Sequence, residues 1–327
     1  MKGWNKLFLS FVCGAWVLML AACGGKEDPN DHLVKAFDQL KAASSYESES
    51  TVKLKINAPD KAKGDPQTEA AVKALNDAKI QVASVVDNKK KQSESTISAS
   101  IKVPPVSFDI KLPVLVDEQN EKVYVQTDNL YENFSMFLPP QIKGKLLEID
   151  TKDSSSQNLK PEEVAKIQKA AQEELLKAVK DKKIKLTEQE VTKEDKDKNI
   201  KNKYKAEVDD AGLKELITNI LTSTSKGLGQ EASQKDLDEL KKSMNEATFK
   251  NTSLVAGLDK DDNFVTMDLN VGIEAKADGE TFGIELALNS AYSKMNQEVK
   301  ITIDPSKADI FKSDELDKYF GSMKHEL

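Results

Sequence analysis

His32 and His325 are the only histidines in this 327-residue chain, and histidine is the side chain best suited to act as a general base or a metal ligand near neutral pH. They lie near opposite ends of the chain, and no pattern in the sequence brings them together. The 55 acidic residues make pairs of carboxylates so common that they do not single out a glycosidase-like site. These residues therefore predict neither a Ser-His-Asp triad nor a histidine-based metal centre.

Two short motifs match known signatures but lack the context that their chemistry requires. Residues 227–232 (GLGQEA) match the G-x-G-x-x-A loop of dinucleotide-binding proteins, yet they follow a predicted helix instead of a strand. Residues 223–226 (STSK) match S-x-x-K, although the chain contains no Lys-Thr-Gly sequence. We interpret the first motif as a linker between helices and the second as a capped helix terminus.

Asp259, Asp261 and Asn263 imitate the first half of a calcium-binding loop, in which alternate residues supply oxygen ligands. Position six of such a loop needs glycine and position twelve needs glutamate, but this chain has Phe264 and Asn270 there. We therefore predict a hairpin turn at this place. Taken with the preceding motifs, this predicts a protein with no catalytic residues, no metal site and no dissociable cofactor.

Cys23 carries the clearest chemical signal in the chain. It follows two basic residues, Lys2 and Lys6, and an apolar run from Leu7 to Leu20 that is shorter than the about 20 residues of a membrane-spanning helix. The lipobox consists of Leu20, Ala21, Ala22 and Cys23. In such a sequence a peptidase cuts the chain before the cysteine, and the thiol of that cysteine carries a diacylglycerol group. The alternatives are an ordinary secretory signal with an incidental cysteine, or a retained anchor helix.

Cysteine usage favours lipidation, because Cys13, the only other cysteine, lies in the segment that would be removed. A single remaining thiol leaves no disulfide framework and no thiolate metal site. We predict a signal peptide over residues 1–22, and the lipidated cysteine with a tether over residues 23–31. Two acyl chains, and an N-acyl chain in many bacteria, would anchor the protein stably to the extracytoplasmic face of the cell membrane.

Charge restricts the choice of partner. The formal net charge is −7, and the chain contains no arginine, so planar bidentate recognition of phosphate is not available. The negative charge therefore argues against nucleic acid or an anionic lipid surface as the main partner. Residues 193–205 hold several lysines but also interleaved acids, which favours a solvated loop over a basic docking strip.

Apolar spacing predicts four main helices. Leu33, Ala36, Phe37 and Leu40 follow the i, i+3, i+4, i+7 pattern of a helix face. Similar patterns predict helices over residues 161–180, over 213–221 with a cap at Asp209 or Asp210, and over 237–244. The Pro- and Lys-rich stretch near 58–79 is predicted to be a peripheral insertion with a short helix, and the chain after Pro139 to be helical.

Alternating apolar and polar residues predict many strands, each with one buried face. We expect strands over 52–56, 80–86, 96–103, 106–116, 122–127, 130–137, 184–191, 201–208, 265–275, 282–288 and 299–303. Amphipathic helices would cover the apolar side of these strands. The prediction is a single α+β domain over residues 32–327 with one extensive antiparallel sheet.

Two local sequences carry a resemblance to a known group, namely residues 40–46 (LKAASSY) after the lipobox and residues 204–209 (YKAEVD) before the helix at 213–221. With the order of elements, the chain resembles uncharacterised Gram-positive lipoproteins related to the LolA and LppX/LprG superfamily. The resemblance implies a large curved antiparallel sheet, or half-barrel, whose concave face is covered by helices with acyl chains held between. The stretch 58–76 and the helix at 237–244 depart from that pattern.

Under this resemblance the inward face of the sheet is the candidate site. The residues that would line an apolar cavity are Phe108, Leu112, Phe137, Met267, Leu269, Phe282, Ile284 and Leu286. The same residues could instead form an ordinary core. The sequence thus predicts a membrane-anchored, non-catalytic protein that binds a lipid or another hydrophobic ligand. The alternative is an envelope structural lipoprotein that has no cavity and binds an unknown envelope protein.

Overall fold

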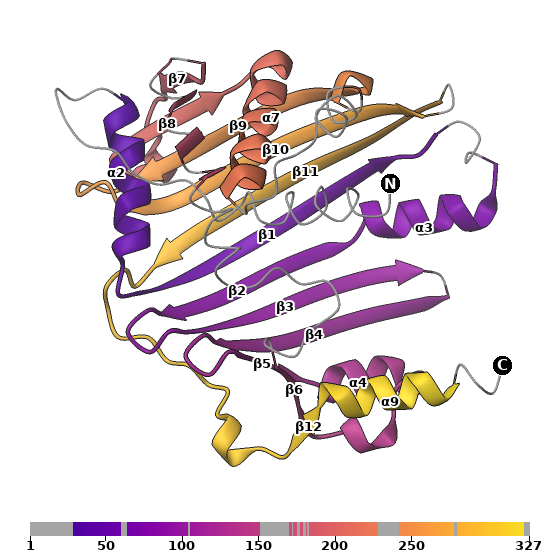
Figure 1. Cartoon of the computed structure of the whole chain (residues 1–327). Helices are drawn as coiled ribbons and strands as arrows, with labels where there is room; N and C mark the ends of the chain where they lie inside the picture. The colour runs from indigo at the N-terminus through magenta and orange to yellow at the C-terminus, as the bar shows by residue number, and fades with distance from the viewer. Residues whose placement is uncertain are drawn as a thin grey trace. The chain divides into compact units, whose positions relative to one another are not determined.

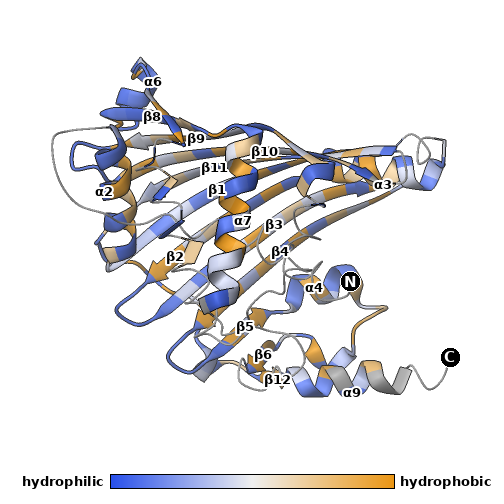
Figure 2. Cartoon of the chain, turned by 45° about the horizontal axis from the view of Figure 1, so that its top comes forward, coloured by the Kyte–Doolittle hydropathy of each residue, from blue (hydrophilic) through white to orange (hydrophobic). Residues whose placement is uncertain are grey.

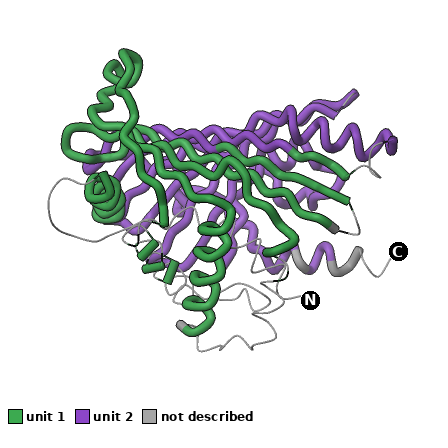
Figure 3. The backbone as a smooth tube through the Cα atoms, turned by 90° about the horizontal axis from the view of Figure 1, so that it is seen from above, with its two compact units in different colours: residues 1–42, 56–62, 159–287 green, residues 43–55, 63–158, 288–327 purple. Residues whose placement is uncertain are grey.

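The structure is a computed structural model of the chain that divides into two compact units (Figure 3). Unit 1 comprises residues 1–42, 56–62 and 159–287, and unit 2 comprises residues 43–55, 63–158 and 288–327. The described residues are 29–59, 64–103, 105–150, 170, 171, 173, 174, 177, 178, 181, 183–227, 242, 244–277 and 280–323. The lipobox, from Leu20 to Cys23, and His325 lie outside them, as do most of the predicted helices at 161–180 and 237–244.

The strands form a twelve-stranded, mostly antiparallel sheet with helices, which confirms the α+β class (Figure 1). Their hydrogen-bonded order is β12-β6-β5-β4-β3-β2-β1-β11-β10-β9-β8-β7, and the β12–β6 pair is parallel. The strands are β1 (Ser45–Asn57), β2 (Lys79–Asp87), β3 (Gln92–Val103), β4 (Val106–Asp117), β5 (Lys122–Gln126), β6 (Leu146–Asp150), β7 (Lys185–Glu188), β8 (Asn202–Glu207), β9 (Ala247–Leu258), β10 (Phe264–Ala277), β11 (Glu280–Ser293) and β12 (Ile310–Lys312).

The helices begin near sequence signals that favour helix starts. They are α2 (Pro29–Ala42), α3 (Pro66–Asn76), α4 (Asp128–Phe134), α6 (Lys193–Asp197), α7 (Asp210–Gly227) and α9 (Ser313–Met323), with short 3-10 turns η3 (Pro140–Ile142) and η4 (Pro305–Lys307). Asp65 caps α3, and Asp209 accepts the N–H of Gly212 at 2.7 Å in the first turn of α7. Among the helices in the described part of the chain, none is long and apolar enough to cross a membrane.

Unit 2 contains a meander from β1 to β6 with apolar clusters on both of its faces. On one face Leu115 and Tyr124 pack with Leu146 and Ile303. On the other, Leu147 packs with Ile142, Phe311 and residues of α4 and α9. Successive residues of β6 therefore enter different cores, so β6 does not show the alternation by which strands are recognised. This explains why the helical prediction after Pro139 was wrong at β6.

Residues 130–137 do not form the predicted strand, because residues 128–134 fold as α4. Asn129 and Asn133, one helical turn apart, bind the edge of β4 that β5 does not reach: the side-chain oxygen of Asn129 accepts the N–H of Lys111 at 2.6 Å. Phe134 stacks on Phe108 of β4 with ring centroids 5.7 Å apart. The helix thus satisfies backbone groups that a strand edge would leave open.

The predicted strand at 299–303 is also wrong, since this segment lies on the sheet without joining it. The carboxylate of Glu94, on β3, accepts the backbone N–H of Thr302 at 2.5 Å and of Ile303 at 2.8 Å, as well as the Thr302 hydroxyl. A side chain therefore takes the hydrogen bonds that a neighbouring strand would supply. Glu94 is only 9% exposed, and Ile303 beside it is buried against Leu115.

In unit 1, α2 and α7 pack on the apolar face of the strands (Figure 2). Phe37 of α2 meets Phe264 edge-on with centroids 4.6 Å apart. Ile217 of α7 packs with Phe249 of β9, next to Ile273 of β10. Leu213 and Leu221 join that cluster, which confirms the predicted helical stripe.

β9 was not predicted, because an irregularity in its register breaks the alternation of its apolar residues. The pairing shifts between Asn270 and Gly272 of β10, and Asn251 of β9 has a φ of 54°. Phe249 precedes this bulge and Leu254 follows it, so an odd and an even position face the same side. The other strands of unit 1 agree with the prediction, although β7 and β8 are shorter.

Residues 193–197 form the short helix α6 instead of the predicted loop, because Thr192 and Asp195 make a capping box. The Asp195 carboxylate accepts the Thr192 N–H at 2.9 Å and the Nζ of Lys203 at 3.0 Å. The bond from the Thr192 N–H, followed by that from Lys203, lowers the pKa of Asp195 from 3.8 to about 2.

This capping box predicts a pH dependence. Because the pKa of Asp195 is lower in the folded chain, its contribution to stability is complete above about pH 4 and is lost as the pH falls through about 2. We expect D195N to melt at a lower temperature than the wild type at pH 5. Between pH 5 and pH 2 the melting temperature of D195N should fall less than that of the wild type. Thermal melts across this range check it, with D197N as a matched exposed control on the same helix. Equal pH profiles for D195N and the wild type would contradict the assignment.

Candidate functional site

The apolar face of β2, β3 and β4 in unit 2 is the candidate site. The pairing register places Val82, Ile97 and Leu112 side by side across the three strands, and Ile101 opposite Phe108. The side chains that share this face are Ile80, Val82, Ile97, Ala99, Ile101, Phe108, Ile110 and Leu112. None of them is buried, and Ile97, at the centre, is 38% exposed. This face is thus unlike the buried cores beside Leu115 and Leu147.

The opposite face of the same three strands is polar. Next to Ile97 in the chain, Ser98 pairs with Gln81 and Lys111, and Asp109 pairs with Ser100. The two faces therefore differ in polarity. The apolar face is nevertheless not buried as a closed core would be. Contiguous apolar surface that stays in contact with water is typical of sites that bind ligands or partners.

The edge of this apolar face near α4 also exposes large side chains. Val106, at the start of β4, is 49% exposed, while Met136 and Phe137, just after α4, are 79% and 60% exposed. Phe108 and Phe134 stack beside them. α3 and α4 contact β3 and β4 respectively, yet the eight side chains of the face remain only partly covered.

The eight residues predicted to line a cavity belong to both units. Phe108, Leu112 and Phe137 lie in unit 2, where the first two share the apolar face and the third follows α4. Unit 1 holds Met267 and Leu269 of β10, and Phe282, Ile284 and Leu286 of β11. Met267 is buried, whereas Phe282 and Ile284 are about 40% exposed. Each unit therefore contributes apolar side chains from this set that are not enclosed.

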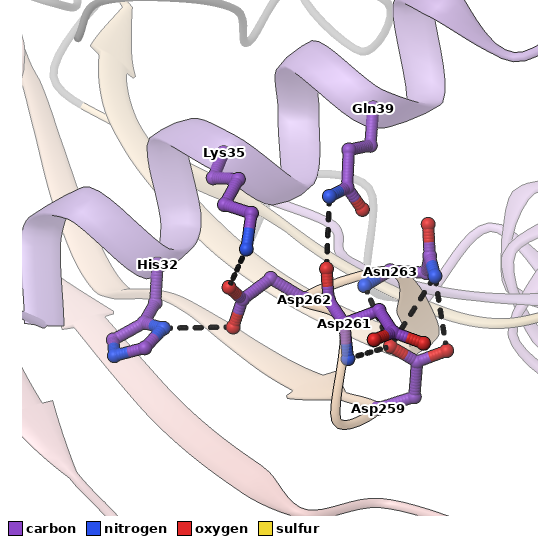
Figure 4. Close-up of polar contacts among 7 residues, drawn as sticks. All are labelled: His32, Lys35, Gln39, Asp259, Asp261, Asp262 and Asn263. Atoms are coloured by element: carbon purple, nitrogen blue, oxygen red, sulfur yellow. Dashed lines mark hydrogen bonds and ion pairs between the residues drawn. The ribbon is translucent and has the colours of Figure 1, made fainter.

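A polar cluster in unit 1 joins α2 to the β9–β10 hairpin (Figure 4). One carboxylate oxygen of Asp262 pairs with the Nδ1 of His32 and the other with the Nζ of Lys35, both at 2.7 Å. Gln39, one turn further along α2, donates to the backbone oxygen of Asp261 at 2.8 Å. The His32 ring also stacks on Tyr204 of β8, with centroids 5.5 Å apart. We call these contacts the α2 clamp.

The α2 clamp was not predicted, because its two halves lie 230 residues apart. Asp262 has a φ of 65°, a conformation that favours asparagine, aspartate and glycine, and its side chain is 7% exposed. Only the folded hairpin gives Asp262 this position. His32 therefore acts as a structural partner of a buried carboxylate.

We expect D262N to lower the free energy of unfolding by about 2 kcal/mol, because the amide keeps the backbone conformation but loses the charge that binds His32 and Lys35. Urea unfolding measures this loss, and hydrogen exchange should increase in α2 before other helices. D261N is the matched control, since Gln39 binds only the backbone oxygen of Asp261. Equal effects of D261N and D262N would contradict the role of the carboxylate.

The hairpin itself confirms the predicted turn at residues 259–263. The Asp259 carboxylate accepts the N–H groups of Asp261 and Asn263 at 2.8 and 2.9 Å and the Asn263 amide at 3.0 Å. These are turn contacts, in which the carboxylate binds its own loop. No group of three or more potential metal ligands occurs within the described ranges.

Among the described residues, the remaining candidate motifs bring no reactive groups together. Ser223 of the S-x-x-K motif lies within α7 and donates to Glu174 at 2.7 Å. A small pocket beside α7, lined by charged residues such as Lys183 and Glu215, has a volume of about 10 Å³, which is room for one water molecule. Of residues 227–232 only Gly227 is described, at the end of α7. No protein-family model and no curated protein sequence matches this chain.

Proposed function

We propose that this chain is a lipid-anchored extracytoplasmic protein that binds a lipid or another hydrophobic ligand without catalysis. The observation that carries this proposal is the half-exposed apolar face of β2, β3 and β4 in unit 2. A face of eight apolar side chains in contact with water is unfavourable by roughly 25 cal/mol for each Å². A hydrophobic ligand on this face would remove that cost.

The proposal includes the finer architecture that the family resemblance implies, namely a sheet that curves into a half-barrel with helices on its concave face. The packing of helices α2 and α7 on the apolar face of unit 1 supports the part of this proposal in which helices cover one face of the sheet. The lipobox ending at Cys23 supports anchoring of the protein to the membrane by a lipid. The exposed side chains at the edge of the candidate face support access of a ligand to that face.

The experiment is to purify the chain with C23S, extract it with organic solvent and analyse the extract by mass spectrometry. We expect a bound lipid, together with saturable uptake of a fluorescent fatty acid. The same cells expressing the unmutated chain should incorporate labelled palmitate, and C23S should not. An extract without ligand, combined with no uptake of the probe, would contradict the binding function. Failure of the unmutated chain to incorporate labelled palmitate would contradict the lipid anchor.

A second candidate function is an envelope protein that docks a protein partner. The adjacent and highly exposed Met136 and Phe137 favour it, because exposed methionine and aromatic side chains are enriched at protein interfaces. Cross-linking in cells that recovers no specific partner through this pair would count against docking.

A further inference from the structure

A group of hydroxyl side chains interrupts the apolar face of unit 2. Ser50 of β1 and Ser290 of β11 lie with their hydroxyl oxygens 2.8 Å apart, and the hydroxyl oxygens of Ser84 on β2 and Ser95 on β3 are also 2.8 Å apart. Ser48 of β1 pairs with Ser84 in the strand register, so it shares their face. These five residues form a hydroxyl band across four strands.

Two tyrosines lie beyond the hydroxyl band. Tyr46 precedes Ser48 by two residues on β1, and Tyr292 follows Ser290 by two on β11, so both share the face of the band. Their ring centroids are 6.2 Å apart. Burial raises the pKa of both phenols, which keeps them neutral. The band and the tyrosines are therefore polar without carrying a charge.

The apolar strip begins directly beside this band. On β3, Ser95 is followed at alternate positions by Ile97, Ala99, Ile101 and Val103, a distance of about 20 Å at about 3.3 Å per residue from Ile97 to Val103. On β4 the apolar side chains continue from Leu112 to Val106 next to them. The strip therefore has the length of an extended acyl chain and a polar group at one end only.

The face carries no charged side chain on any of these strands. The positions that β1 to β4 place on it within unit 2 are Tyr46, Ser48, Ser50, Val52, Leu54, Ile80, Val82, Ser84, Val86, Ser93, Ser95, Ile97, Ala99, Ile101, Val103, Val106, Phe108, Ile110, Leu112, Val114 and Val116. The lysines and acids of the same strands occupy the alternate positions. An anionic headgroup would leave water here without a cation to compensate for it, which is costly.

We propose that this face binds an uncharged amphiphile, an acyl chain along the apolar strip with an ester or hydroxyl end at the hydroxyl band. In each serine pair one O–H donates to its partner, and because a hydroxyl has one donor and two acceptor positions, each pair has hydrogen-bonding capacity beyond this bond. Ester and hydroxyl oxygens match these donors and acceptors. This inference rests on the proposed function and adds the class of ligand to it.

The experiment compares three probes with one acyl chain, namely 1-monooleoylglycerol, methyl oleate and oleate at pH 8, by displacement of a fluorescent fatty acid from the C23S chain. We expect 1-monooleoylglycerol to bind at least tenfold more tightly than oleate. The double variant S84V/S95V should bind 1-monooleoylglycerol about tenfold more weakly. Methyl oleate, which has an ester but no hydroxyl, should lose less affinity. S84T/S95T keeps both hydroxyls and should keep the preference, and S98V/S100V on the polar face should behave as the wild type.

The outcomes separate this inference from the proposed function. Binding of all three probes with equal affinity, or tighter binding of oleate, would overturn the inference and leave the function intact. Failure of every probe to bind a folded chain would overturn both. Circular dichroism and thermal melts establish that each variant is folded, and if S84V/S95V fails to fold, the single variant S95V with S95T takes its place.

Discussion

Replacing Glu94 with alanine is expected to lower the free energy of unfolding by about 3 kcal/mol and to release the segment around Thr302. The change removes the acceptor for two backbone N–H groups and one hydroxyl, at a site where Glu94 is 9% exposed. Each buried donor without a partner costs about 1–3 kcal/mol. Ile303 would also lose its packing on Leu115, which is fully buried.

Urea unfolding measures the loss of stability, and limited trypsin digestion measures the release of the segment. Cleavage after Lys300 or Lys307 should become faster in E94A, because both lysines flank the bonded residues. E94Q keeps one oxygen acceptor and should lose less stability than E94A. E49A is the matched control, since Glu49 lies exposed on β1. Trypsin cleavage at the same rate in E94A and E49A would contradict the role of Glu94.

Replacing Ile97 with glutamate is expected to weaken the binding of a hydrophobic probe by at least tenfold. Ile97 lies between Val82 and Leu112 at the centre of the apolar face, so a carboxylate there would have to leave water when an acyl chain binds. Because Ile97 is 38% exposed in the free chain, the carboxylate can reach solvent and the fold should persist. Fluorescent fatty-acid titration measures the change in affinity.

Two variants make this prediction specific. S98E introduces the same charge at the next residue on the polar face, and it should bind the probe as the wild type does. I97W keeps the site apolar but fills space, so it should change the affinity less than I97E does. If S98E and I97E weaken binding equally, the charge acts through the stability of β3 and the apolar face is not the site.

Much of the fold could be predicted because alternation and helical spacing survive in most elements. The strand from Val106 to Val116 and the helix stripe from Leu213 to Leu221 were predicted from such patterns and are confirmed. The predictions were wrong where a contact between distant residues, or a bulge, determines the local structure. Leu146 and Leu147 enter separate cores, a bulge near Asn251 changes the phase of β9, and Glu94 takes the backbone bonds of Thr302.

The candidate site could be predicted only in part. Phe108 and Leu112 were expected to share an apolar face, and the register of β3 and β4 places them so. The pair of Ser50 and Ser290 was not predicted, because the two residues lie 240 positions apart and only the order of strands brings them together. The α2 clamp escaped prediction for the same reason, since His32 and Asp262 meet only in the fold.

Photolabelling of the C23S chain with a fatty acid that carries a diazirine along its acyl chain tests directly whether the apolar face binds a ligand. After irradiation and digestion, mass spectrometry locates the labelled residues. We expect saturable labelling on the apolar face of β2, β3 and β4, at residues such as Ile97, Ile101 and Leu112, and we expect unlabelled ligand to suppress it. Labelling confined to the polar face or to Met136 and Phe137, or labelling that unlabelled ligand does not suppress, would contradict it.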